Sequence, residues 1–137
     1  MQLTAGKPYA AKGDSRQDLV GDVLAGTLSI VSENFKGNFC ITVTHSAFLL
    51  IYEKMFKERP AAVTDDVKDV LAELVNMIYG QAKTVLNDRH GYGILPALPT
   101  VLSGSALKVY HSGAGPTICL PFTMNDHTLL VEVSSEK

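Results

Sequence analysis

A long helical pattern spans residues 64–86, with the sequence TDDVKDVLAELVNMIYGQAKTVL, and strand-like patterns lie before and after it. Thr64 is a suitable N-cap. The negative charges of Asp65 and Asp66 are favourable in the first turn, because the N-terminal end of a helix carries a partial positive charge. The sequence NDRHGYG at residues 87–93 has the composition of a loop. We therefore predict one long helix from Thr64 to about Leu86.

The two faces of this helix differ in chemistry when its residues are placed at steps of about 100°. The apolar residues share one broad arc, which predicts the buried face: Val67, Val70, Leu71, Leu74, Met77, Ile78 and Val85. A narrow polar stripe lies on the opposite side and consists of Asp69, Glu73, Asn76 and Gly80. This stripe is expected to face solvent or a partner.

Gly80 is unusual in such a stripe, because a glycine in mid-helix costs about 0.5 to 1 kcal/mol relative to alanine. Two explanations are open. Another segment of the same chain could pack closely against Gly80. Alternatively, a partner could approach the helix there, beside Glu73 and Asn76.

The stripe has a structural and a chemical interpretation. An ordinary solvated face is the commoner explanation for charged residues on a helix. A functional site would need chemistry that suits these side chains. Asn76 carries both a donor and an acceptor, so it can orient a water molecule but is a poor base. A glutamate such as Glu73 is ionised at neutral pH, so it would repel a phosphate and attract a lysine.

Strand and helix patterns also precede the long helix. Residues 27–30 and 39–44 alternate between apolar and polar across a turn at residues 33–38, which predicts an antiparallel hairpin with one wet face. A shorter helical stripe follows. We expect Ser46 to cap this second helix and Pro60 to close it.

Strand patterns resume after the long helix, at residues 100–104, 118–124 and 129–134, and residues 9–11 are a candidate short strand. Pro121 has no N–H to donate, so its strand is expected at a sheet edge or with a bulge. Clusters of strands flank two helices without a regular strand–helix repeat. This arrangement predicts an α+β fold, with a largely antiparallel sheet and both helices packed on one face.

Composition limits the function classes. A chain of 137 residues with 46% hydrophobic residues is expected to form one domain with one core. Its net charge of −2, without a basic block, argues against nucleic acid and anionic membranes as partners. The first seven residues lack the apolar core of a signal peptide, and no apolar run approaches the roughly 18 residues of a membrane span. A cytoplasmic protein is expected.

Other chemical sites have little support. Cys40 and Cys119 lie far apart in strand-like runs, so we expect small buried side chains in a reducing compartment, although one disulfide is possible. The four histidines lack partners at metal-ligand spacing, and no metal site is expected; they are His45, His90, His111 and His127. The chain contains no Gly-x-x-x-x-Gly-Lys, and the sequence SGAGP at residues 112–116 predicts a turn.

Two segments resemble a known family. The sequence DVLAELVNMIYG at residues 69–80 resembles the Asp/Ser-x-x-x-Glu-x-x-Asn helix motif of the CheC/CheX/FliY family of chemotaxis phosphatases. The sequence PTVLSG at residues 99–104 is similar to the Pro-x-x-x-x-Gly segment of that family. A single copy of the motif resembles the CheX type, and the resemblance covers about residues 7–133.

The resemblance implies a CheC-like fold and a hydrolase that removes phosphate from an aspartyl group of a CheY-like response regulator, in chemotaxis or in other two-component signalling. Asn76 would orient the attacking water, and Glu73 would pair with the active-site lysine of the regulator. Asp69, Gly80 and Lys83 would contact the regulator, although a solvated side chain is the commoner explanation for Lys83. Phosphoryl transfer needs mostly positioning and charge stabilisation. The chain is therefore expected to bind no cofactor, and Mg²⁺ is expected on the regulator.

The chain also departs from the family. Members usually begin with an additional amphipathic helix, whereas this sequence starts near residues 7–9, KPY, without one. Either the chain is truncated or the family plan is altered, and residues 1–137 are expected to form a single CheX-like domain that lacks this helix. The CheX resemblance further implies a homodimer whose sheets join across the subunits. A non-catalytic regulator-binding or flagellar rotor-type adaptor of the same fold is the alternative function, and the presence of both Glu73 and Asn76 favours catalysis.

Overall fold

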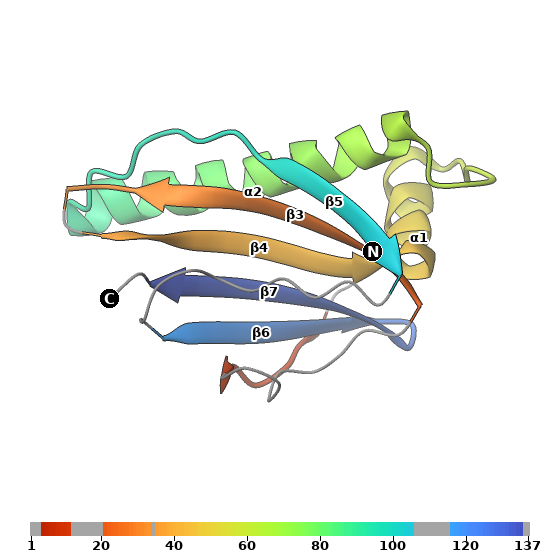
Figure 1. Ribbon diagram of the computed structural model, residues 1–137, viewed down its shortest axis with the longest axis horizontal. Coiled ribbons are helices and arrows are strands. Elements are labelled where there is room, and N and C mark those ends of the chain that lie inside the picture. Colours follow the sequence, from red (N-terminus) through yellow and green to blue (C-terminus); the bar gives the residue numbers. More distant parts are fainter. Residues whose placement is uncertain (1–3, 12–20, 34, 106–115, 136–137) are drawn as a thin grey trace.

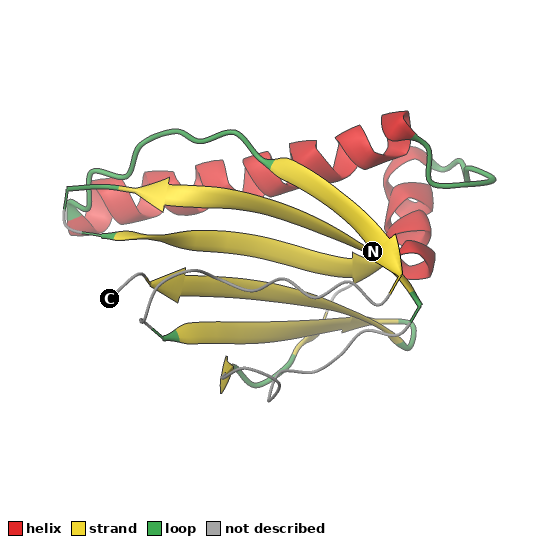
Figure 2. Ribbon diagram, viewed as in Figure 1, coloured by secondary structure: helices red, strands yellow, loops and turns green. Residues whose placement is uncertain are grey.

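The structure is a computed structural model that describes residues 4–11, 21–33, 35–105 and 116–135 (Figure 1). Its strands are β1 (Thr4–Ala5), β2 (Tyr9–Ala11), β3 (Asp22–Val31), β4 (Lys36–Thr44), β5 (Thr100–Ser105), β6 (Thr117–Met124) and β7 (His127–Ser135). The helices within the described residues are α1 (His45–Phe56) and α2 (Asp65–His90). Both helices pack on one face of the sheet, where α2 runs along the strands and α1 stands across one end (Figure 2). The predicted α+β class is confirmed.

All strand pairs are antiparallel, and the strands lie in the order β1-β6-β7-β4-β3-β5, with β2 also paired to β6. The predicted hairpin is β3 and β4, which pair from Val23 opposite Thr44 to Val31 opposite Lys36. The other predicted strands correspond to β2, β5, β6 and β7. The strand positions are therefore confirmed. The wet face predicted for the hairpin is wrong at Cys40 and Thr42, which are buried, and the environment predicted for Pro121 is wrong as well.

The edge or bulge predicted at Pro121 is wrong. Strand β6 has β7 on one side and β1 and β2 on the other, and its register with β7 is continuous. The Pro121 carbonyl accepts a hydrogen bond of 2.7 Å from the Gly6 N–H, so the polar groups of Pro121 face the β1–β2 side. The N–H and the carbonyl of one strand residue point to the same side. The side of Pro121 that lacks an N–H donor therefore faces the gap between β1 and β2. No hydrogen bond between β6 and β7 is lost.

The N-cap of α1 is Thr44 rather than the predicted Ser46. The last residue of β4 has an extended conformation, and its hydroxyl oxygen accepts a hydrogen bond of 3.1 Å from the Ala47 N–H. The helix begins directly at His45, without an intervening loop, so Ser46 is already inside the first turn. At the other end, Lys57 adopts the left-handed conformation and ends α1 before Pro60 is reached.

Helix α2 begins as predicted and ends later than predicted. The Thr64 hydroxyl oxygen accepts from the Val67 N–H at 3.4 Å. Residues 87–90, predicted as loop, are helical, and the helix stops at Gly91, which has φ 64°. A glycine in this conformation terminates a helix without steric cost. Asp88, Arg89 and His90 are exposed, and Asn87 is half-buried, so the loop-like composition of residues 87–90 did not interrupt the helix.

The core between the sheet and the helices is apolar. Its members come largely from strands β3 and β4 and both helices, and they include Leu24, Leu28, Phe39, Val43, Phe48, Leu71 and Val75. On the other face of the sheet, Cys40 and Cys119 are buried, and no disulfide joins them. None of the helices in the described ranges is both long and apolar enough to cross a membrane.

Candidate functional site

Helix α2 buries a narrower face than its sequence predicts. The buried side chains are Val67, Leu71, Val75 and Tyr79. Met77, Ile78 and Val85, predicted as buried, are 55%, 43% and 45% exposed. A row of residues spaced four apart drifts by about 40° per step around the helix axis. The four buried residues form such a row. Val75 and Tyr79 therefore remain in contact with the sheet, whereas Met77 and Ile78 are exposed.

The polar stripe lies where the sequence predicts it. Asp69, Glu73 and Asn76 are exposed, on the side of α2 away from the sheet. Neither Asp69 nor Glu73 forms an ion pair with a residue that the structure describes. The nearest ion pair on the helix joins the Lys68 ammonium to the Asp65 carboxylate at 3.8 Å. Both acidic side chains of the stripe are thus available to a cation from outside the chain.

Gly80 lies on the same side of α2, one turn beyond Asn76, and is half-buried. A Cβ built at Gly80 meets no heavy atom within 4 Å, so nothing in the described part of the chain packs against it. The explanation by close packing within the chain is therefore wrong for the described residues. Lys83, one turn further, is half-buried.

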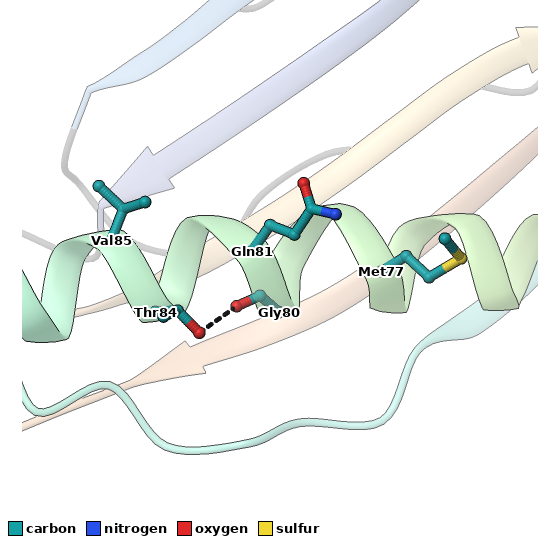
Figure 3. A pocket seen from close by; sticks show the side chains of 5 residues that line it. All are labelled: Met77, Gly80, Gln81, Thr84 and Val85. Carbon is teal, nitrogen blue, oxygen red and sulfur yellow. Dashed lines mark hydrogen bonds between the residues drawn. The ribbon is translucent and has the colours of Figure 1, made fainter.

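A shallow hollow on the helix surface surrounds Gly80. We call it the Gly80 shelf, and it is lined by Met77, Gly80, Gln81, Thr84 and Val85 (Figure 3). The Thr84 hydroxyl donates a hydrogen bond of 3.0 Å to the Gly80 carbonyl. Sequence reasoning singled out only Gly80 among these residues. It placed Met77 and Val85 in the buried arc. Met77 lies at the margin of that arc, but Val85 lies five turns after Val67 on the same side of the helix, so the sequence carried no signal for its exposure.

The segment between α2 and β5 is tied to the side of α2. The Tyr79 hydroxyl donates to the Leu95 carbonyl at 2.7 Å. The Asn87 side chain bonds both backbone groups of Ile94, accepting from the N–H at 2.6 Å and donating to the carbonyl at 3.0 Å. Burial raises the pKa of the Tyr79 phenol. These bonds hold the segment that follows α2 against the helix. The segment leads into β5, which also packs against α2.

The two segments that carry the family resemblance are therefore neighbours in space. Residues 69–80 lie on α2, and residues 100–104 lie in β5, which pairs with β3 beneath the helix. His45, at the start of α1, approaches this strand, with 3.4 Å between its Nε2 and the Ser103 hydroxyl oxygen.

The described part of the chain contains no group of three His, Cys, Asp or Glu side chains that could hold a metal ion. His111 and residues 112–115 of the predicted turn lie outside the described residues. What the site offers is an exposed amide, two exposed carboxylates and an open glycine on one helical surface. This arrangement can position water and attract a cation.

Comparisons with known proteins show the family to which the chain belongs. The family model described as chemotaxis phosphatase CheX matches residues 25–123. A CheC-like superfamily protein from Shewanella sp. PV-4 is 33% identical over 100% of this chain and 86% of its own, with a TM-score of 0.88. The chemotaxis protein CheX from Vibrio vulnificus is 30% identical over 99% of this chain and 87% of its own, with a TM-score of 0.87.

A more distant likeness concerns the fold alone. The structure of the CheX–CheY–BeF3–Mg²⁺ complex from Borrelia burgdorferi matches with 19% identity over 98% of this chain and 84% of the other, and a TM-score of 0.76. No match is found among curated proteins. The family model covers most of the chain, and two solved relatives share about a third of its residues. The chain therefore belongs to the CheX type of the CheC/CheX/FliY family of chemotaxis phosphatases.

Proposed function

We propose that this protein hydrolyses the aspartyl phosphate of a CheY-like response regulator. The observation that carries the proposal is the joint exposure of Glu73 and Asn76 on one side of α2, with no described segment covering them. Membership of a family of chemotaxis phosphatases supports the reaction. The complex in which CheX of B. burgdorferi was solved with CheY supports a regulator as the partner.

Asn76 is proposed to orient the attacking water. Its amide can accept a hydrogen bond from the water and donate another to a phosphoryl oxygen. Hydrolysis of a phosphoryl group passes through a loose transition state, in which placing the water in line matters more than removing its proton. An asparagine on a rigid helix suits this task, because the backbone of α2 is held by the buried side chains on its other side.

Glu73 is proposed to pair with the active-site lysine of the regulator. Residues three apart on a helix are surface neighbours, with Cβ atoms about 5–6 Å apart, so Glu73 and Asn76 can engage one small site together. Asp69 adds negative charge one turn before Glu73, where a basic side chain of the regulator can approach. Lys83 is proposed to contact an acidic group at the other end of the interface.

Mg²⁺ is proposed to belong to the regulator and not to this chain. The described residues of α2 contribute to no cluster of three metal-ligating side chains, and Glu73 and Asn76 alone would give a poor site. The chain is thus proposed to need no cofactor of its own. Its contribution is to position water and to neutralise a lysine.

A homodimer is proposed as the working form, in the cytoplasm. Within the described residues, β5 pairs with β3 on one side, and no strand lies on its other side. An open strand edge can receive a strand of a second subunit. Buried thiols without a disulfide fit the reducing conditions of the cytoplasm.

The deciding experiment labels candidate regulators with a small phosphodonor and follows the loss of aspartyl phosphate with wild type and with Asn76→Ala. Wild type is expected to accelerate the loss, and Asn76→Ala is expected to reduce the acceleration by about a hundredfold. Asp88→Ala, an exposed residue near the end of α2, is the control and should behave as wild type. A wild-type protein that binds the regulator without accelerating the loss would be an adaptor. An Asn76→Ala variant as fast as wild type would remove the assigned role of Asn76.

A further inference from the structure

The Gly80 shelf differs from the stripe that it adjoins. Asp69 and Glu73 are charged, whereas none of the five shelf residues carries an ionisable group. Met77 and Val85 expose about half of their side chains there. The exposed side of α2 thus changes, along its length, from acidic to neutral and partly apolar, with Asn76 at the boundary.

Gly80 is the residue of the shelf that the fold does not explain. A Cβ at this position would stand in open space, so alanine would fit and would favour the helix. The Thr84 hydroxyl already bonds to the Gly80 carbonyl, so this carbonyl needs no contact from elsewhere in the chain. The absence of a side chain at position 80 therefore leaves room for a group outside the described residues of this chain.

We propose that the Gly80 shelf receives a neutral backbone segment of the response regulator that lies next to its phosphorylated aspartate, with Gly80 as the point of closest approach. This inference rests on the proposed function, and it assigns to the shelf the specificity for the regulator. The acidic stripe attracts the regulator lysine, and the shelf determines how closely the two proteins can approach.

The spacing along the helix supports this occupant. Gly80 lies one turn, about 6 Å, beyond Asn76 on the same side of α2. A regulator that brings its phosphoryl group to Asn76 must also place the adjoining chain over the next turn. A side chain at position 80 would hold that chain away from Asn76. Met77 and Val85 border the hollow and lose exposed apolar surface when it is covered (Figure 3).

The test compares Gly80→Ala, Gly80→Gln and the control Ala82→Gln. Ala82 is exposed and lies on another side of the same helical turn, so its variant adds the same side chain away from the shelf. Affinity is measured by titration with a regulator held in its active form by beryllofluoride, and turnover is measured with the phosphorylated regulator. Thermal unfolding reports whether each variant is folded.

Gly80→Ala is expected to raise the unfolding temperature and yet weaken regulator binding, a combination that a purely structural role of Gly80 would not produce. Gly80→Gln is expected to weaken binding about tenfold or more and to raise KM. Ala82→Gln should bind as wild type does. Unchanged affinity in a folded Gly80→Gln variant would overturn the proposal.

The outcomes separate this inference from the proposed function. If wild type binds the regulator without hydrolysing its phosphate, the phosphatase proposal fails, and weaker binding by Gly80→Gln still supports the shelf. If wild type hydrolyses the phosphate and Gly80→Gln has an unchanged Kd and KM, only the shelf proposal fails. If Gly80→Gln changes the oligomeric state and leaves regulator binding intact, the shelf belongs to a second copy of the chain, and the proposal is overturned.

Discussion

Gly26 of β3 lies directly under Val75 of α2, so close that a Cβ on Gly26 would come within 2.6 Å of the Val75 Cγ2 atom. Val75 is fully buried in this contact. Because Val75 is held against the sheet, its neighbour Asn76, about 100° further around the helix, is exposed on the flank of α2. The contact between a strand glycine and a helix valine therefore sets the rotation of α2 and, through it, the exposure of the candidate site.

Gly26→Ala is expected to destabilise the protein by about 1–3 kcal/mol, because the added methyl group overlaps the Val75 side chain. Chemical denaturation of wild type and variant measures the loss. Val75→Ala removes the overlapping methyl groups, so the double variant should be more stable than the sum of the two single changes predicts. Strict additivity would show that the contact does not determine how α2 packs.

Glu73→Gln is expected to weaken binding to the regulator by a few-fold, corresponding to about 1 kcal/mol for an exposed ion pair. The difference from wild type should shrink as salt is added, because salt screens exposed charges. Titrations at low and high ionic strength measure both effects. Asp88→Asn removes an exposed carboxylate near the end of the same helix and serves as the control. Equal losses in the two variants would point to net charge and would contradict a specific pairing of Glu73.

Thr44→Ala is expected to cost about 1 kcal/mol of stability, because the Ala47 N–H loses the hydroxyl that caps α1. Ser46→Ala should change the stability by less than about 0.5 kcal/mol, since Ser46 is exposed inside the first turn. Thermal unfolding of the two variants compares the two residues as caps. A larger loss for Ser46→Ala would reverse the assignment of the cap.

The stability of the protein is expected to fall at alkaline pH through Tyr79. Burial raises the pKa of the Tyr79 phenol above its usual value of 10.0, so the folded state keeps the proton after the unfolded chain has released it. The stabilising contribution is complete below pH 10 and is lost as the pH rises from there toward the raised pKa. Denaturation at several alkaline pH values measures the slope. Tyr79→Phe should show a shallower slope, and an identical slope would exclude Tyr79 as its source.

Much of the fold could be predicted from hydrophobic periodicity. The alternation at residues 27–30 and 39–44 located the central hairpin, and the long helical pattern located α2. The errors occurred where local chemistry was ambiguous. The polar residues 87–90 read equally as a loop or as a last helical turn, and Gly91 decided between them only through its conformation.

The candidate site was predicted in part. The exposed side of α2 with Asp69, Glu73 and Asn76 followed from the sequence, because residues three and four apart share one side of a helix. The sequence could not place Met77 and Val85. Both are apolar, and Val85 shares its side of the helix with the buried Val67, so only the packing against the sheet could show that they are exposed.

The sequence by itself determined the α+β class, the long helix and the polar stripe along it, because these depend on the periods of neighbouring residues. Only the tertiary structure decided which apolar residues of α2 are buried and whether Gly80 is covered by the chain. Both depend on contacts between residues far apart in sequence, above all on the place where Val75 meets Gly26. A helix pattern gives the sides of a helix relative to one another, and the sheet decides which of them faces inward.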